Sequence, residues 1–189
     1  MHHTEGYLAG QFLIAAPGIK DERFEKTVLY IYRHDEDGAT GLIINQPCEN
    51  IDFHELCEQL SIPVSVNCSH VELYDGGPVE GNRGYVLHTD DFIGRDTHHI
   101  QGTNLSVTTT VDVLRRIAEG TGPNKALITL GCAIWQKGQL EDELTRHGWL
   151  HDKASNDILF SCPHKKRWER TIQNIGIHFA GLAQYTGTA

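Results

Sequence analysis

The stretch TVLYIYRHDEDGATGLIINQP, residues 27–47, decides the fold of this chain. Residues 27–32 are β-branched and aromatic, which is typical of a strand. Residues 41–45 form a second apolar run, which ends before Pro47. The polar residues 34–38 lie between the two runs and form a turn. Two strands around a short polar turn predict a β-hairpin.

Further strands and helices follow one another along the rest of the chain. Apolar runs predict strands at residues 12–16, 71–74, 84–88, 105–108, 125–130 and 158–160. Helices are predicted from a capping box at Asp52 and Glu55, from a second capping box at 109–112 to Gly120, over 138–147, and from Ser161 to Gly176. The elements show no strict βαβ rhythm, which favours a mixed α/β (α+β) fold with a central mixed β-sheet flanked by helices.

Length and composition indicate one globular unit. A chain of 189 residues suits a single domain, and at this length folding buries roughly 70% of the surface of the unfolded chain. The hydrophobic fraction of 39% and the charged fraction of 22% are ordinary. We therefore expect one domain over residues 1–189.

The charge balance disfavours direct binding to nucleic acid. There are 16 Lys and Arg against 25 Asp and Glu, which gives a formal net charge of −9. A duplex-binding domain obtains most of its affinity from a basic surface. The dense basic cluster of Lys165, Lys166, Arg167 and Arg170 is too small to offset the acidic total, and no helix-turn-helix pattern is evident.

The cysteines indicate a reducing compartment. The five cysteines form no C-x-x-C pair, and their number is odd, which argues against a disulfide framework or a zinc ribbon; they are Cys48, Cys57, Cys68, Cys132 and Cys162. The chain begins with polar residues, and the apolar run 12–16 is too short for a signal peptide or a membrane span. We expect a cytoplasmic protein without membrane association.

Cys132 is a candidate nucleophile. It follows the predicted strand 125–130, where two glycines, Gly131 and Gly138, lead into the next predicted helix. Such a junction can expose a side chain and backbone N–H groups at the end of a sheet. A reactive thiol needs a base or a helix N-terminus to lower its pKa, and nothing in the sequence places a histidine beside it. A small buried cysteine is the commoner case.

The segment DGGPVEGNRG, residues 75–84, is rich in glycine and contains Arg83. Glycines let the backbone approach a ligand closely, and a nest of N–H groups can hold an anion. The segment lacks the G-K-[ST] of a P-loop and the spacing of a dinucleotide fingerprint. Asp75 and Glu80 would repel phosphate. Two tight turns before a strand explain the glycines equally well.

The sequence predicts neither a metal nor a cofactor. Asp35 and Asp37 resemble part of a calcium loop, but Arg33 and Ile44 occupy its first and last ligand positions. Residues 70–72, His-Val-Glu, match the start of a zinc deaminase signature, but no P-C-x-x-C follows.

Several of these segments together resemble the AlgH/YqgE family of small bacterial proteins. The matching pieces occur in family order and cover nearly the whole chain: 12–17, 27–30 with His34, 38–47, 76–79, 83–84, 87–88, Gly131, Ala133, Trp135, 138–141, Trp149 and Trp168. The resemblance implies a single α/β domain with a central mixed sheet in a bacterial cytoplasmic protein. Members of this family have been labelled transcriptional regulators, so the resemblance implies that role as well. It implies no catalytic residue for this chain.

Our leading hypothesis is a regulatory or interaction protein that binds a small ligand or a protein partner. The candidate contact residues are the polar, aromatic and glycine residues at predicted strand ends: Asn45, Gly76, Gly77, Pro78, Arg83, His88, Trp135 and Gln139. A second hypothesis is a hydrolase or transferase that uses Cys132, or a base at His34 or His88. A third is a regulator that binds DNA directly, which the net charge disfavours.

Overall fold

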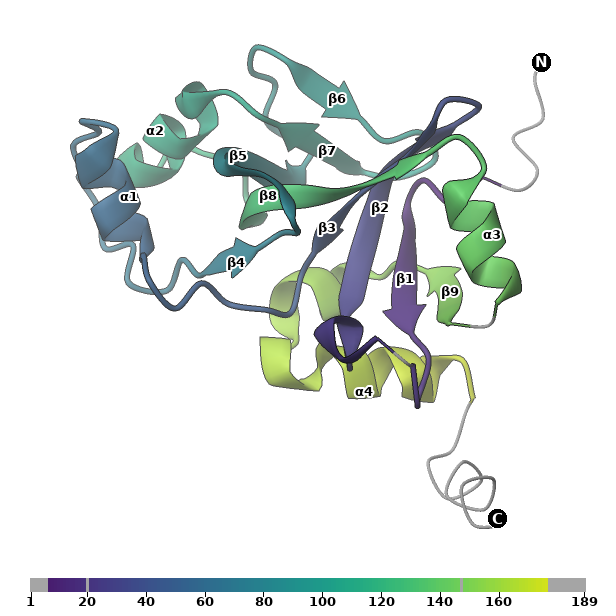
Figure 1. Ribbon diagram of the computed structural model, residues 1–189. Coiled ribbons are helices and arrows are strands. Elements are labelled where there is room, and N and C mark those ends of the chain that lie inside the picture. The colour runs from purple at the N-terminus through teal and green to yellow at the C-terminus, as the bar shows by residue number, and fades with distance from the viewer. Residues whose placement is uncertain (1–6, 20, 147, 177–189) are drawn as a thin grey trace.

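The structure is a computed structural model that describes residues 7–19, 21–146 and 148–176 (Figure 1). Its strands are β1 (Gln11–Ala15), β2 (Val28–Asp35), β3 (Gly38–Ile43), β4 (Leu73–Asp75), β5 (Val79–Thr89), β6 (Thr97–His99), β7 (Leu105–Thr108), β8 (Ala126–Gln136) and β9 (Trp149–Lys153). Its helices are η1 (Glu22–Phe24), α1 (Phe53–Gln59), α2 (Val111–Glu119), α3 (Gln139–Thr145), η2 (Asp157–Ser161) and α4 (His164–Asn174). Among these helices, none is long and apolar enough to cross a membrane.

The strands of the described residues form one nine-stranded sheet. Eight of them follow the order β6-β7-β5-β8-β3-β2-β1-β9, and β4 pairs with β8 beside this path. The β4–β8 pair is parallel, whereas the other pairs are antiparallel. The sheet is therefore mixed, and the mixed α/β class predicted from the sequence is confirmed.

The predicted hairpin is present as β2 and β3, with Tyr30 opposite Leu42. Alternate residues of β2 enter two different cores, because side chains point to opposite faces of a strand. Val28 and Tyr30 belong to one core, and Leu29 and Ile31 belong to the other. Both faces are buried, which explains why the strand is a continuous apolar run rather than an alternating one.

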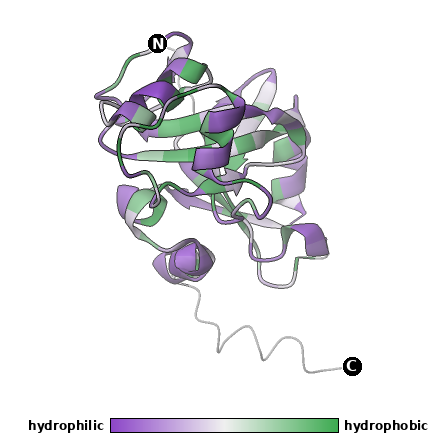
Figure 2. Ribbon diagram, turned by 90° about the vertical axis from the view of Figure 1, so that its left-hand side faces the viewer, coloured by the Kyte–Doolittle hydropathy of each residue, from purple (hydrophilic) through white to green (hydrophobic). Residues whose placement is uncertain are grey.

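Helices pack against the sheet in three apolar cores. The first core joins η2 and α4 to β1, β2 and β3 through Ile158, Trp168 and Ile172. The second core, on the other side of those strands, contains Leu140 of α3. The third core packs α1 and α2 on β4, β5 and β8. Figure 2 shows hydrophobic residues concentrated in the strands, with hydrophilic residues on the surrounding helices and loops.

The chain crosses β8 between β4 and β5. Residues 128–130 of β8 pair with β4 on one edge and with β5 on the other, and Figure 1 shows these two strands on opposite sides of β8. The chain leaves β4 at Asp75 and reaches the other edge at Val79, which lies opposite Cys132. Residues 76–78 therefore pass over the backbone of β8.

Glycines make this crossing possible. A Cβ atom on Gly77 would lie 2.4 Å from the carbonyl carbon of Cys132, and one on Gly76 would lie 2.2 Å from the carbonyl oxygen of Gly131. Gly77 and Gly131 also have φ angles of 143° and 77°, in the region that favours glycine. The glycine-rich segment thus has a structural role, which was one of the two interpretations of its sequence.

The length of β8 corrects the prediction for the region around Cys132. The predicted strand ended at Leu130, but β8 continues to Gln136, and Ala133 pairs with β3. Gly131 lets the strand continue under the crossing chain instead of ending it. Cys132 consequently lies inside a strand and not at a strand-to-helix junction, which occurs at residues 137–138.

Two local predictions were also wrong, and one strand was missed. Residues 158–160 form part of the π-helix η2 and not a strand, because their apolar side chains pack on the sheet from the α4 side. The Thr110 side chain makes no capping hydrogen bond to α2, so the second capping box is absent. Strand β9 was missed, since an edge strand with the sequence WLHDK lacks a buried apolar run. The first capping box, at Asp52 and Glu55, is confirmed.

The crossing predicts a contrast between two nearby glycines. Gly77→Ala places a methyl group against the backbone of Cys132, which no rotamer change can relieve, so we expect a loss of about 3 kcal/mol or more in the free energy of unfolding. Gly81→Ala is the control, because a Cβ there meets nothing within 4 Å. Urea unfolding measures both variants. Equal stabilities would contradict the steric role of the crossing.

Candidate functional site

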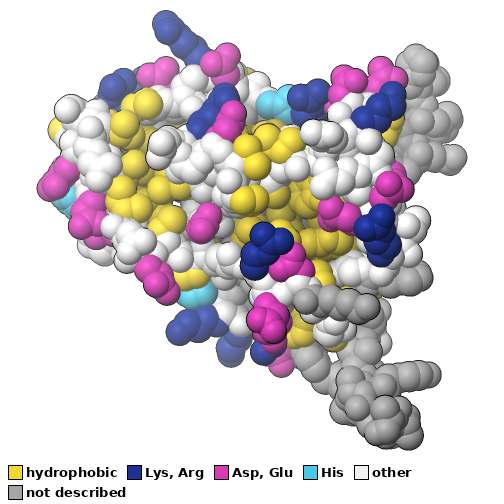
Figure 3. Space-filling view, in the orientation of Figure 1, with side chains coloured by type: hydrophobic (Ala, Val, Ile, Leu, Met, Phe, Trp, Pro, Cys, Tyr) yellow, Lys and Arg dark blue, Asp and Glu magenta, His cyan; other side chains and the backbone are white. Residues whose placement is uncertain are grey.

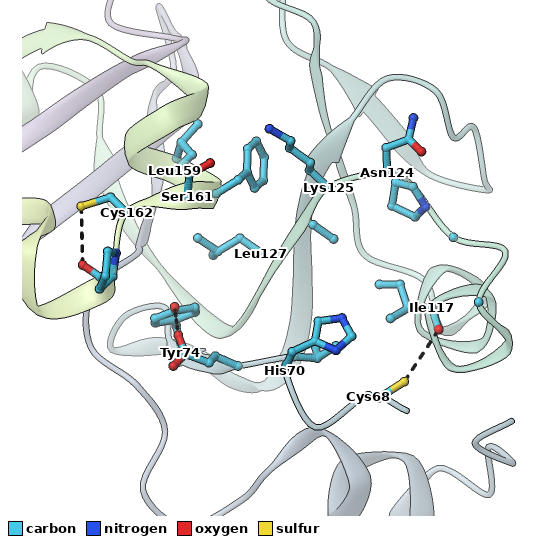
Figure 4. Close-up of a pocket in the computed structure, with 18 of the residues that line it drawn as sticks. Cys68, His70, Tyr74, Ile117, Asn124, Lys125, Leu127, Leu159, Ser161 and Cys162 are labelled. Atoms are coloured by element: carbon cyan, nitrogen blue, oxygen red, sulfur yellow. Dashed lines mark hydrogen bonds between the residues drawn. The ribbon is translucent and has the colours of Figure 1, made fainter. Parts of the chain in front are cut away.

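A cleft of about 660 Å³ opens between three segments that are distant in sequence. Its lining residues come from 66–74, from 117–127 and from 159–167. The segments are the approach to β4, the connection from α2 into β8, and the junction of η2 with α4. In Figure 4, Lys125 and His70 lie on opposite sides of this cleft.

Arg167 contributes a buried cation to the wall of the cleft. Its residue surface is only 5% exposed. Nε donates to the carbonyls of Ile158 and Cys162, at 3.1 and 3.2 Å, and Nη1 donates to the carbonyl of Ile44. The guanidinium carbon lies 5.0 Å from the centroid of the Tyr74 ring. No carboxylate of the described residues forms an ion pair with Arg167.

Glu72, Tyr74 and His164 form a polar group beside this cation. The Tyr74 hydroxyl donates to the Glu72 carboxylate, and His164 Nδ1 lies 3.5 Å from Glu72 Oε2. The bond from Tyr74 lowers the pKa of Glu72, although burial opposes this shift. Burial, and then the bond to Glu72, raises the pKa of Tyr74 to about 12. At neutral pH the hydroxyl therefore keeps its proton, and the carboxylate keeps its charge.

The first turn of α4 adds further positive charge. Residues 164–167 are His-Lys-Lys-Arg, the turn contains no acidic residue, and no side chain of the described residues caps it. Cations at a helix N-terminus oppose the helix dipole. Figure 3 shows Lys and Arg side chains gathered at the lower left of the molecule, where α4 begins. An otherwise acidic chain thus concentrates positive charge beside the cleft.

The eight predicted contact residues lie in several separate parts of the structure. Gly76, Gly77, Pro78 and Arg83 lie together near the crossing of β8, Trp135 and Gln139 lie at α3, and Asn45 and His88 lie apart from both groups. None of the eight lines the 660 Å³ cleft. Their role in binding stays a prediction.

Arg83 belongs to a chain of polar side chains that reaches Cys132. Its Nη1 lies 3.4 Å from Glu80 Oε2, and its guanidinium carbon lies 5.6 Å from the Tyr85 ring centroid. The Tyr85 hydroxyl donates to Glu80 and accepts from the Cys132 thiol at 3.4 Å. Cys132 is fully buried, and burial raises the pKa of its thiol. The chain therefore holds a neutral thiol and not a nucleophilic thiolate.

His34 has both ring nitrogens occupied. Nδ1 accepts from the backbone N–H of Leu8 at 3.0 Å, which leaves the proton on Nε2. Nε2 lies 2.9 Å from Glu141 Oε1 and donates to it. The imidazole therefore fixes the start of β1 and α3 to the hairpin and has no free nitrogen for base catalysis.

His88 is likewise bound at both nitrogens. Nδ1 lies 2.7 Å from the Thr89 carbonyl oxygen and donates to it, and Nε2 lies 2.8 Å from Thr108 Oγ1. The residue is fully buried, and burial lowers its pKa from the ordinary value of 6.5. His88 is therefore a neutral, buried histidine whose two hydrogen bonds stabilise the interior between β5 and β7.

Glu143 joins Trp135 and Gln139 at α3, and the sequence interpretation missed it. Glu143 Oε2 accepts from the indole nitrogens of Trp135 and Trp149, at 3.0 and 3.1 Å. Its Oε1 accepts from Gln139 Nε2 at 3.1 Å. Carboxylates at a helix start favour the helix dipole, and this one also fixes the helix to the sheet.

Asn45 connects the two strands of the hairpin at their open end. Its Oδ1 accepts from the Val28 N–H at 2.9 Å, and its Nδ2 donates to the Lys26 carbonyl at 2.7 Å. Asn45 also lines a second pocket, of about 430 Å³, together with His164 and Lys165 of α4. The basic start of α4 therefore borders both this pocket and the larger cleft.

The comparisons with known proteins agree with this fold. A model of the AlgH-like family matches residues 12–180. The chain belongs to the AlgH-like family. A UPF0301 protein of Afipia carboxidovorans is 42% identical over 190 residues, which cover 97% of this chain and 90% of that protein. Another, from Rhizorhabdus wittichii, is 42% identical over 182 residues, with 96% and 97% covered.

Two solved structures resemble this AlgH-like chain. The solution structure of AlgH from Pseudomonas aeruginosa has a TM-score of 0.79 and 39% identity, and the match covers 100% of this chain and 98% of that one. A crystal structure of a Corynebacterium diphtheriae protein has a TM-score of 0.71 and 18% identity, over 92% and 90% of the two chains. The second likeness shows the fold alone. The resemblance found in the sequence is confirmed.

The side chains that line the cleft determine what this AlgH-like protein can bind there. The cleft offers a buried guanidinium, an ammonium at Lys125 and a carboxylate at Glu72 that is already hydrogen-bonded. Among the described residues, no three His, Cys, Asp or Glu side chains gather as a metal site. The arrangement can bind and orient a ligand through charge and hydrogen bonds.

His88 predicts that acid destabilises this AlgH-like protein. Its pKa is lowered in the folded state, so the unfolded chain takes up a proton first, and stability present above pH 6.5 is lost as the pH falls below that value. Urea unfolding of the wild type between about pH 7 and 5 should show this loss, with a smaller slope in His88→Gln. The exposed His99→Gln is the control. Identical slopes for the wild type and His88→Gln would refute the assignment.

Glu143→Ala should loosen α3. The two indole N–H groups lose their acceptor while remaining buried, which costs about 2 kcal/mol of the free energy of unfolding. Urea unfolding followed by tryptophan fluorescence measures the loss. Glu36→Ala, in the exposed turn between β2 and β3, should stay within about 0.5 kcal/mol of the wild type. A loss of similar size in both variants would count against the proposed docking role.

Proposed function

We propose that this AlgH-like protein is a cytoplasmic, non-enzymatic regulatory protein that binds a small ligand in the 660 Å³ cleft. The observation that carries the proposal is Arg167, a buried cation fixed in the wall of the cleft. Small-molecule sites have volumes of roughly 300–1,000 Å³ and a few convergent polar groups. The cleft has such a volume, and its polar groups come from three segments.

The depth of Arg167 favours a small ligand over a protein partner. A protein interface buries roughly 800 Å² on each side and is spread over the surface. Arg167 as a residue is only 5% exposed, so the broad surface of a partner would not reach it, whereas a molecule that enters the cleft would. Lys125 and His70 stand at the sides of the opening and would meet the same molecule.

A binding role fits the geometry better than catalysis. Cys132 lies in the interior, does not line the cleft and is bonded to Tyr85. The two histidines considered as bases, His34 and His88, have both ring nitrogens engaged. The hypothesis of a hydrolase or transferase that uses these three residues therefore has neither a reactive thiol nor a free imidazole nitrogen to support it.

The cytoplasmic assignment is supported by the thiols. All five cysteines are free. Free thiols persist where glutathione and thioredoxin keep them reduced. The proposal therefore places the protein where small regulatory metabolites occur.

Filling the cleft tests the proposal. Ser161→Trp adds an indole at a lining position, and Glu36→Trp adds the same group in the distant β2–β3 turn. A low-molecular-mass metabolite fraction from bacterial cells should raise the melting temperature of the wild type and of Glu36→Trp, because a ligand of the folded state stabilises it. Ser161→Trp should show no such rise, and native mass spectrometry should show a bound small molecule only in the first two proteins. An equal response of both variants would reject the cleft as the site.

A further inference from the structure

We infer that the ligand of this cleft carries a phosphate group, an inference that rests on the proposed function. The recognising groups are the guanidinium of Arg167 and the ammonium of Lys125, which line the cleft from two different segments. The Glu72 carboxylate lies in the same wall and has partners of its own.

Arg167 is a buried charge that forms no direct ion pair with a carboxylate of the described residues. Its contacts are three carbonyl oxygens and the ring and hydroxyl of Tyr74. The Glu72 carboxylate attracts it without a direct ion pair and is shared with Tyr74 and His164. Fully buried arginines are almost always paired, because an unpaired charge in the interior is expensive. The carbonyls engage Nε and Nη1 out of five N–H donors. A bound anion would supply a negative charge in direct contact with the guanidinium, which the shared Glu72 carboxylate does not.

Lys125 provides a second cation on another side of the cleft. Its side chain is exposed and points into the opening in Figure 4. No carboxylate of the residues described forms an ion pair with it. Glu72 is the single carboxylate among the lining residues, and it already accepts from Tyr74 and faces His164. The cleft therefore has a surplus of positive charge.

Phosphate satisfies two separate cations better than a carboxylate does. A phosphate ester carries a charge of about −1.5 to −2 at neutral pH and presents three acceptor oxygens. A planar carboxylate is matched by a single guanidinium through two parallel bonds. Lys125 and Arg167 line the cleft from different segments, and a tetrahedral group presents its oxygens in several directions, as such an arrangement requires. The basic residues 164–166 at the start of α4 add to the same local charge.

A small phosphorylated molecule fits this site better than a duplex does. The phosphates of DNA stay on the outside of a stiff double helix, so they cannot be brought to a residue as buried as Arg167, which is 5% exposed. The formal net charge of −9 also repels a polyanion. The site is therefore assigned to a compact ligand that enters the cleft.

Inorganic phosphate is the probe that tests this inference on the full chain. We expect a titration followed by ¹H–¹⁵N NMR to give saturable shifts of the amides of residues 66–72, 122–127 and 159–167. Acetate at the same ionic strength should give shifts that are at least tenfold weaker. Lys125→Gln should weaken the affinity for phosphate by roughly tenfold, the effect of losing about 1.4 kcal/mol. Arg167 is left intact, because its substitution would also disturb α4.

The matched control is Lys137→Gln, an exposed lysine in the turn between β8 and α3. Phosphate affinity should be unchanged in this variant. Equal weakening by the two substitutions, or shifts spread over the whole surface, would show an adventitious ion only and overturn the inference. An acetate response as strong as that of phosphate would assign the cleft to carboxylates. Shifts produced by a duplex oligonucleotide but not by phosphate would show that these residues bind DNA and would also overturn the inference.

The outcomes separate this inference from the proposed function. If the metabolite fraction stabilises the wild type but not Ser161→Trp, while phosphate produces no saturable shifts, the cleft binds a ligand without a phosphate group. In that case the further inference fails, and the proposed function stands. If neither the metabolite fraction nor phosphate distinguishes the variants, both fail.

Discussion

The passage of residues 75–79 across β8 is the constraint on which the rest of this structure depends. At its centre the Gly76 N–H donates to the Leu130 carbonyl at 2.8 Å, and the Gly76 carbonyl accepts from the Ile43 N–H at 2.9 Å. One residue thus joins the end of β3 to β8 just after β4. The crossing places β4 and β5 on opposite edges of β8. Because β4 carries Tyr74, the wall of the cleft depends on the same passage.

Local sequence patterns predicted most of the elements, and they failed where distant contacts decide the backbone. The β2–β3 hairpin and the capping box of α1 follow from apolar runs and turn residues, which act between near neighbours. The apolar run predicts a strand that ends at Leu130, just before Gly131. The actual role of Gly131 is to leave room for a chain segment more than fifty residues away, and no local pattern contains that information. Residues 158–160 show the same limit, since three apolar residues fit a strand or a helical turn equally well.

The candidate site was less predictable than the fold, because it is made by three segments that meet only in the folded chain. The residues chosen from the sequence were glycines and polar groups at strand ends, and several of them have structural partners instead, such as Asn45 and Trp135. One signal was available. Residues 164–167 place basic side chains at a helix start with no acidic residue in the same turn, which contradicts the preference set by the helix dipole.

Arg167 links the stability of the fold to recognition at the cleft. Its bonds to the carbonyls of Ile158, Cys162 and Ile44 fasten η2 and α4 to the end of the hairpin. The same bonds immobilise the guanidinium before any ligand arrives, so little side-chain entropy is left to lose on binding. The acidic surface does not cancel this charge, because exposed charges are screened beyond about 10 Å at 0.1 M salt whereas a buried cation is screened much less. An anion bound to Arg167 in the cleft would therefore also strengthen the attachment of α4 to the sheet.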